Sequence, residues 1–282
     1  MENVIVSDEE RLEKLKQNIL EAGAEKFHVL ADFDRTLTKA FVDGEKIPSF
    51  ISELRRGDYI GLEYAKKANA LFDKYHPIEM DHSISDEEKS KAMHDWWSEH
   101  FELLMESGLN KKHLEAIVAS GKIHFRDGAL EFLDFLHNYK IPLVIMSSIG
   151  LGGDSIRMML EREDRLYDNI HIISNEFEWD SSGRATGVKE PIIHIMNKKE
   201  VTLEKLDIYD ELLKRKNVLL LGDGLGDIHM IEGFDYDNLI KIGFLSYNVE
   251  NSLEEYKKAY DITILNDGSF NYVNGMLKEI VK

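Results

Sequence analysis

The chain has 282 residues, 43% of them hydrophobic and 31% charged, with a formal net charge of −18 and no cysteine. The acidic balance argues against a nucleic-acid polymer as partner, because binding one requires a basic surface. The lack of cysteine excludes disulfides, zinc–thiolate sites and a thiol nucleophile. No N-terminal signal or apolar run of membrane-spanning length is visible, so we expect a cytoplasmic protein with no membrane partner.

A helix is expected first, between about residues 7 and 23. Residues 7–10 read Ser-Asp-Glu-Glu, the form of a capping box with Ser7 as the N-cap. Leu12 and Ile19 belong to an apolar stripe at helical spacing, and Gly23 is typical of the end of a helix.

A buried strand that ends in two carboxylates follows. Residues 28–38 read HVLADFDRTLT, and such an apolar run suits a strand of a parallel sheet. Ligands of these sheets bind beyond the carboxyl ends of the strands, where Asp32 and Asp34 would lie. Two neighbouring carboxylates repel unless a cation or a proton separates them. The segment therefore indicates Mg²⁺, proton transfer or both; the alternative is a pair of turn residues without chemistry.

Amphipathic helices replace strands between about residues 41 and 125. We expect one helix at about 62–74, stopped before Pro77, and another from a second capping box at Ser85 to about residue 108. A third is expected at 111–119. Two tryptophans, Trp96 and Trp97, are better explained by core packing than by base stacking, and at most one would face an active site. This stretch predicts a helical domain, 41–125, inserted into a core formed by 1–40 and 126–282.

After residue 125 strands and helices alternate. Helices are expected at about 127–139, 154–166, 227–231 and 271–281, and strands at about 142–146, 170–177, 217–221, 239–244 and 262–265, with a turn at 180–183. Such alternation predicts an α/β fold with a doubly wound, mostly parallel sheet covered on both faces.

Two later strands also lead into polar residues. The strand at 217–221 runs into Gly-Asp-Gly-Leu-Gly-Asp, which contains Asp223 and Asp227. Either these are a turn residue and an N-cap, or they give Mg²⁺ a second acidic strand end. The strand at 142–146 runs into Ser147 and Ser148, whose hydroxyls and free backbone amides can hold a phosphate.

These elements occur in the order Asp-x-Asp-x-Thr, a hydroxyl at a strand end, a lysine (Lys198) and Gly-Asp-x-x-x-Asp. The pattern resembles the haloacid dehalogenase superfamily of phosphohydrolases. Residues 75–79, 96–97, 169–175, 194–198, 219–227 and 240–245 are similar, more closely, to the cytosolic 5′-nucleotidase III (pyrimidine 5′-nucleotidase) family. The longer, glycine-rich turn after Ser148 and residues 98–100 depart from that family's pattern, and the second departure bears on base preference.

The resemblance implies a Mg²⁺-dependent 5′-nucleotidase that hydrolyses nucleoside 5′-monophosphates, pyrimidine ones first, through an aspartyl-phosphate. It implies these roles: Asp32 as nucleophile, Asp34 as general acid and base, Mg²⁺ at Asp32, the Asp34 carbonyl and Asp223, phosphate binding by Ser147, Ser148 and Lys198, support from Asp227, and base recognition by Glu79. The helical insertion would be the cap that selects the substrate.

Two alternatives use the same fold. One is a phosphatase of another small ester, such as phosphoserine or a sugar phosphate. The other is a catalytically silent binding module, which is disfavoured because the acidic, hydroxyl and lysine positions of the pattern are all present. Phosphoryl transfer to a nucleoside is expected as a side reaction.

Overall fold

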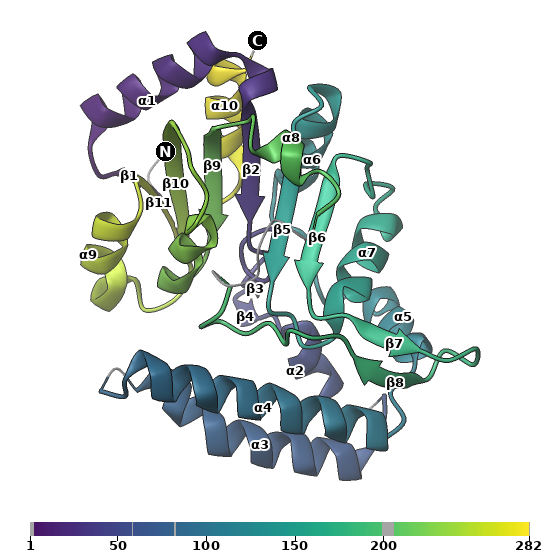
Figure 1. Cartoon of the computed structure of the whole chain (residues 1–282). Helices are drawn as coiled ribbons and strands as arrows, with labels where there is room; N and C mark the ends of the chain where they lie inside the picture. The colour runs from purple at the N-terminus through teal and green to yellow at the C-terminus, as the bar shows by residue number, and fades with distance from the viewer. Residues whose placement is uncertain (1–2, 58, 82, 199–205, 282) are drawn as a thin grey trace.

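The computed structural model describes residues 3–57, 59–81, 83–198 and 206–281. A seven-stranded sheet forms its centre (Figure 1). The strand order is β1 (Val4–Val6), β11 (Ile262–Leu265), β10 (Asn238–Leu245), β9 (Asn217–Gly222), β2 (Phe27–Ala31), β5 (Leu143–Ser147) and β6 (Ile170–Ser174). Only β1 runs antiparallel to its neighbour in this sheet. The predicted α/β fold with a mostly parallel sheet is confirmed.

Strand β2 lies at the middle of the sheet, between β9 and β5. Its last residue, Ala31, pairs with Leu221 of β9 and with Ile145 of β5. All residues of these three strands are buried, which explains their continuous apolar sequences. The register brings the carboxyl ends of the three strands to one edge of the sheet.

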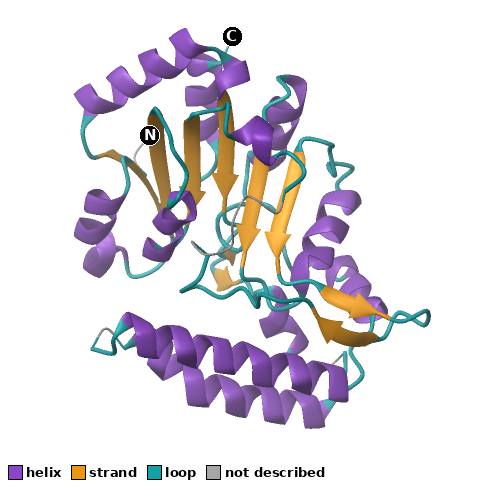
Figure 2. Ribbon diagram, viewed as in Figure 1, coloured by secondary structure: helices purple, strands orange, loops and turns teal. Residues whose placement is uncertain are grey.

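Helices cover both faces of the sheet (Figure 2). Along β2, Val29 and Ala31 belong to one buried cluster and Leu30 to the other, as expected for a strand whose successive side chains point to opposite faces. The first cluster is covered by α1 (Glu9–Ala22), α6 (Ala129–Asn138), α7 (Gly152–Arg162) and α10 (Asn271–Ile280). The second is covered by α8 (Tyr209–Leu212), the 3₁₀ helix η3 (Leu225–Ile231) and α9 (Val249–Ala259). Another 3₁₀ turn, η1 (Ala24–Lys26), precedes β2.

Within its described residues, the stretch between 41 and 125 forms a small hairpin and four helices. These are β3 (Phe41–Val42), β4 (Glu45–Lys46), α2 (Phe50–Leu54), α3 (Leu62–Met80), α4 (Asp86–Glu106) and α5 (Lys111–Ala119). Helices α3 and α4 pack side by side beyond the carboxyl ends of the sheet strands (Figure 1). A second hairpin, β7 (Phe177–Trp179) with β8 (Ala185–Val188), contacts α4. Helix α5 instead packs on α7, and its apolar residues join the core of the sheet.

Several predicted element boundaries are wrong. Helix α3 does not stop before Pro77 but continues to Met80, because Tyr75 packs with Met93 and Trp96 of α4 and this packing outweighs the local cost of proline. The N-cap of α1 is Asp8, whose side chain accepts a hydrogen bond from the Arg11 amide. The Ser7 hydroxyl instead donates to the backbone carbonyl of Tyr260.

The strand expected at 170–177 is two strands, β6 and β7, and only β6 belongs to the main sheet. Strand β1 was not predicted, because three residues show no periodicity, and its place depends on pairing with β11.

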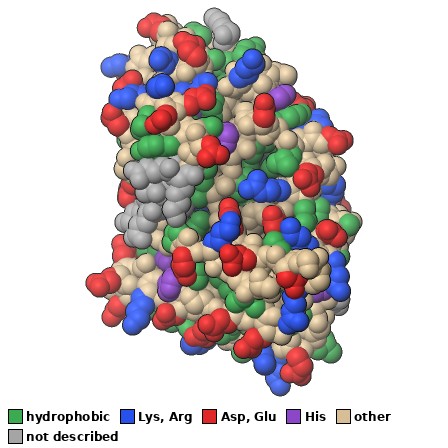
Figure 3. All heavy atoms as spheres, turned by 45° about the vertical axis from the view of Figure 1, so that its right-hand side comes forward, with side chains coloured by type: hydrophobic (Ala, Val, Ile, Leu, Met, Phe, Trp, Pro, Cys, Tyr) green, Lys and Arg blue, Asp and Glu red, His purple; other side chains and the backbone are tan. Residues whose placement is uncertain are grey.

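The surface carries both signs of charge. Acidic and basic side chains are interspersed over the face shown in Figure 3. Within the described ranges, no helix is long and apolar enough to span a membrane.

Candidate active site

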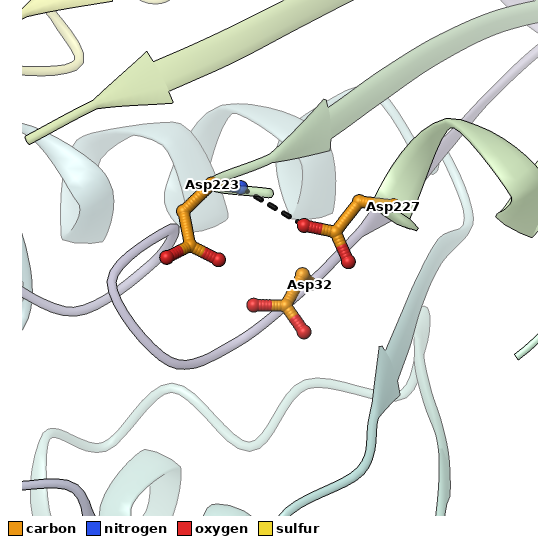
Figure 4. Close-up of side chains that lie close together, drawn as sticks. All are labelled: Asp32, Asp223 and Asp227. Atoms are coloured by element: carbon orange, nitrogen blue, oxygen red, sulfur yellow. Dashed lines mark hydrogen bonds between the residues drawn. The ribbon is translucent and has the colours of Figure 1, made fainter. Parts of the chain in front are cut away.

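Three carboxylates meet at the carboxyl edge of the sheet (Figure 4). Asp32 follows β2, Asp223 follows β9, and Asp227 lies in the 3₁₀ helix after β9. One carboxylate oxygen from each lies within 4.8 Å of those of the other two. Asp32 and Asp227 are buried, and Asp223 is half-buried. The pairing of β2 with β9 therefore brings together side chains that are about 190 positions apart in the sequence.

Asp227 holds the glycine-rich turn in shape. Its Oδ2 accepts from the amide of Asp223 at 3.0 Å and from that of Gly224 at 2.9 Å. The N-cap of the 3₁₀ helix is Gly224, so the prediction of Asp227 as the N-cap is wrong; Asp227 is the third helical residue and reaches back to the cap. A Cβ on Gly222 would lie 2.5 Å from the Cβ of Asp227, so this close approach requires glycine.

Lys198 lies between two of the carboxylates. Its Nζ donates to Asp32 Oδ1 at 2.6 Å and to Asp227 Oδ1 at 2.7 Å, and the lysine is only 4% exposed. Burial by itself would lower the pKa of Lys198, but the two carboxylates outweigh it and raise the pKa above its usual value. The structure thus places in the site a lysine that the sequence marked only through its family resemblance.

The site carries more negative charge than Lys198 neutralises. Burial and the Asp227 carboxylate raise the pKa of Asp32 to about 7, despite the Lys198 ammonium. Burial, together with the neighbouring carboxylates Asp227 and Asp32, also raises the pKa of Asp223 well above its usual range. This all-oxygen donor set with excess negative charge fits a hard divalent cation such as Mg²⁺. Asp227 accepts three hydrogen bonds, two of them from amides of the turn that it holds. Asp32 accepts from Lys198 and, at 3.4 Å, from the Thr36 hydroxyl. Asp223 and Asp32, which hold no part of that turn, are therefore the better candidates for the side-chain ligands of the cation.

Asp34 stands apart from the three-carboxylate group. It is half-buried, and burial raises its pKa while the neighbouring Arg35 opposes the rise. A residue missed by the sequence analysis, Arg126, holds the loop that follows Asp34. Its Nε donates to the carbonyl of Thr36 at 2.9 Å, and Nη2 donates to the carbonyl of Arg35. No motif marked Arg126, although it directly follows the stretch 41–125 in which helices were expected.

Ser147 and Ser148 also lie at the carboxyl edge. Ser147 is the last residue of β5 and is buried, whereas Ser148 is half-buried. The turn after them is covered by α4, because a Cβ on Gly150 would lie 2.5 Å from the ring of Trp97. Trp96 is buried among α3 and α4 side chains. The expectation that at most one of the two tryptophans faces the strand ends agrees with this placement.

Glu79 is not among the residues gathered at the strand ends. It lies in the last turn of α3, where its Oε2 is 3.0 Å from Nδ1 of His76. The His76 ring beside Glu79 stacks on Phe72 of the same helix, and Trp96 of α4 stacks on Tyr75 and on Trp97.

Comparison with known proteins identifies similar enzymes. The family model of pyrimidine 5′-nucleotidase (UMPH-1) matches residues 35–281. The chain is 35% identical to 7-methylguanosine phosphate-specific 5′-nucleotidase A of Xenopus laevis over 278 residues, which cover 98% of this chain and 95% of that protein. It is 32% identical to the 7-methylguanosine phosphate-specific 5′-nucleotidase of Homo sapiens over 279 residues, which cover 99% and 92%.

Solved structures give the same result. The crystal structure of cytosolic 5′-nucleotidase IIIB bound to cytidine superposes with a TM-score of 0.90 at 26% identity, covering 99% of this chain and 94% of that one. A substrate-bound phosphoserine phosphatase, at 18% identity and a TM-score of 0.53 over 90% of this chain and 97% of that one, shares the fold.

Proposed function

Because the chain belongs to the pyrimidine 5′-nucleotidase family, whose members are phosphoric monoester hydrolases, we propose that it hydrolyses pyrimidine nucleoside 5′-monophosphates in a Mg²⁺-dependent reaction. The observation that carries this proposal is the set of three carboxylates and one buried lysine at the carboxyl edge of the sheet. Such a site suits a phosphate dianion only when further positive charge is present, which Mg²⁺ would supply.

In this proposal an oxygen of Asp32 attacks the substrate phosphorus, and the bond from phosphorus to the 5′-oxygen breaks. Asp34, protonated at the start, gives its proton to the leaving oxygen. It then takes a proton from water, whose oxygen attacks the aspartyl-phosphate, releasing phosphate and restoring Asp32. Asp32, the Asp34 carbonyl and Asp223 would hold Mg²⁺, whose charge offsets the repulsion between the nucleophile and the dianion.

The remaining site residues have supporting parts in the proposal. Ser147 and Ser148 bind phosphoryl oxygens from the end of β5. Lys198 binds phosphate and keeps Asp32 oriented, a part supported by its contacts with Asp32 and Asp227. Asp227 maintains the turn that carries Asp223.

We propose further that residues 41–125 act as a substrate-selecting cap on a core of 1–40 and 126–282. The position of α3 and α4 beyond the strand ends supports this, as does the contact of Trp97 with Gly150. Glu79 would accept a hydrogen bond from the nucleobase in place of the one from His76. A cytoplasmic location is supported by the cytosolic relative of the same fold.

A second candidate substrate is 7-methylguanosine monophosphate. It is favoured by the activity for which the Xenopus and human relatives are named. The positively charged methylated base would also suit the carboxylate of Glu79 and the stacked rings of His76 and Phe72 beside it.

Phosphate release from CMP, UMP, 7-methyl-GMP, AMP, GMP, phosphoserine and a sugar phosphate tests the proposal, each with Mg²⁺ and with EDTA. We expect hydrolysis of CMP and UMP in Mg²⁺ only. Preferred hydrolysis of 7-methyl-GMP would support the second candidate. Hydrolysis of non-nucleotide esters alone would contradict the proposed base recognition, and no release from any ester would support the silent binding module.

A further inference from the structure

Arg35 occupies an unusual backbone position directly after Asp34. Its φ is 62°, in the left-handed region that favours glycine and that bulky side chains seldom adopt. A large charged residue is held there, directly after Asp34 in the loop that follows β2. Strained positions of this kind often lie at functional sites.

Arg126 holds the backbone around Arg35 through hydrogen bonds to its carbonyl groups. Arg126 is 2% exposed. Its guanidinium donates to the carbonyls of Arg35, Thr36 and Gly268 and pairs with Asp267 at 2.8 Å. The amide of Arg35 donates to the hydroxyl of Thr38 at 2.8 Å. Arg126 therefore has a structural role, because its guanidinium is hydrogen-bonded to backbone carbonyls and to Asp267.

The Arg35 guanidinium has a different environment. Its carbon lies 5.3 Å from the centre of the Tyr247 ring, and Nζ of Lys46 lies 4.8 Å from the same centre. Burial alone would lower the pKa of Arg35, but neighbouring acidic groups, Asp223 first and Asp34 among them, raise it. The guanidinium is thus half-buried, next to the catalytic carboxylates and in the field of a second cation.

Its hydrogen-bonding groups are not used within the part of the chain that the structure describes. There, no side chain or carbonyl accepts from the Arg35 guanidinium at hydrogen-bond distance, and no carboxylate pairs with it at 4.0 Å or less. Lys198, by contrast, donates to two carboxylates. A half-buried guanidinium with unused donors and a like-charged neighbour has the properties of an anion-binding group.

We propose that Arg35 binds the phosphoryl oxygens of the substrate and is, beside Lys198, a second cation for the phosphate dianion. The inference rests on the proposed function, because it takes the anion to be the phosphoryl group attacked by Asp32. Arginine suits this part better than lysine, since its planar guanidinium can donate two parallel hydrogen bonds to phosphate. The Tyr247 ring packs against one side of the Arg35 guanidinium. Arg126 fixes the backbone of Arg35 through its hydrogen bond to the Arg35 carbonyl.

The test compares two variants. Arg35→Met keeps an apolar side chain against Tyr247 without the charge, and Arg35→Lys keeps the charge without the two parallel donors of the guanidinium. Arg157→Met, at an exposed position of α7, is the matched control for loss of one positive charge. The measurements are KM for the nucleotide that the wild type hydrolyses, the inhibition constant of inorganic phosphate, and phosphate binding by calorimetry. We expect Arg35→Met to raise KM and the inhibition constant about 10- to 100-fold, the range for a lost charged hydrogen bond. Arg35→Lys should be intermediate and Arg157→Met unchanged.

Unchanged KM and phosphate inhibition in Arg35→Met would overturn the proposal, as would a change confined to kcat and Mg²⁺ dependence, which would instead make Arg35 a positioning residue for Asp223. Arg35→Gly provides a second variant that keeps the fold, because glycine adopts the left-handed conformation without strain. If the wild type hydrolyses no nucleotide, the proposed function fails. Calorimetry with inorganic phosphate still tests Arg35 by itself, and equal phosphate affinity of wild type and Arg35→Met then overturns the inference.

Discussion

Replacing Lys198 by methionine removes an ammonium that contacts both Asp32 and Asp227. The wild-type contacts are 2.6 and 2.7 Å long and nearly inaccessible to water. Methionine fills a similar volume but leaves two buried carboxylates, with Asp223 beside them, without that compensation. Removing one partner of a buried ion pair costs about 3–5 kcal/mol in the free energy of unfolding. We expect a loss of that size in metal-free buffer.

Urea unfolding of wild type and Lys198→Met, in EDTA and in excess Mg²⁺, measures this effect. The loss should be smaller in Mg²⁺, because a bound cation restores positive charge beside the carboxylates. In Mg²⁺, kcat/KM should still fall by about 100-fold or more, since the substrate dianion also loses a cation. Lys189→Met, which removes an exposed lysine paired with Glu176, serves as the control and should unfold as the wild type does.

Equal unfolding midpoints for wild type and Lys198→Met in EDTA would refute this reasoning. Such a result would mean that the carboxylates are protonated or hydrated in the metal-free protein and do not depend on the ammonium.

Three further predictions concern other parts of the molecule. Asp34→Asn should lower kcat by about 10²- to 10⁴-fold, the usual effect of a general acid, while a Mg²⁺-induced rise in melting temperature persists; wild-type turnover would contradict its role. Gly150→Ala should cost about 1–3 kcal/mol in urea unfolding, because its Cβ would meet Trp97 at 2.5 Å. Gly275→Ala, in α10 with nothing within 4 Å, should instead stabilise by up to about 1 kcal/mol; equal effects would refute the contact. Burial lowers the pKa of His28 to about 4. Below pH 6.5 the unfolded state therefore binds a proton that the folded state does not bind, and the free energy of unfolding decreases as the pH is lowered. Between pH 7 and pH 5 we expect about 2 kcal/mol of this loss in the wild type, and a shallower slope for His28→Gln in urea unfolding at the two pH values.

The sequence by itself was sufficient for the fold class and the family. Strands buried on both faces have continuous apolar sequences, so β2, β5 and β9 were recognisable one at a time. Parallel strands end at the same edge of a sheet, which made Asp32 and Asp223 possible neighbours, and the family resemblance decided for a shared site against the alternative of a turn residue. The structure brings both carboxylates together, while their catalytic roles and that of Asp34 remain predictions for the variants described above.

Tertiary structure decided the features that depend on contacts between distant residues. Pro77 would end an isolated helix, yet α3 continues because its buried face packs on α4. Lys198 is one of 35 basic residues, and only the folded chain shows that it lies between Asp32 and Asp227. The same holds for the contrast between Arg126, whose donors are used, and Arg35, whose guanidinium is not hydrogen-bonded within the described residues. Periodicity and motifs record local preference and burial, whereas the partner of a charged side chain is set by the packing of elements far apart in the sequence.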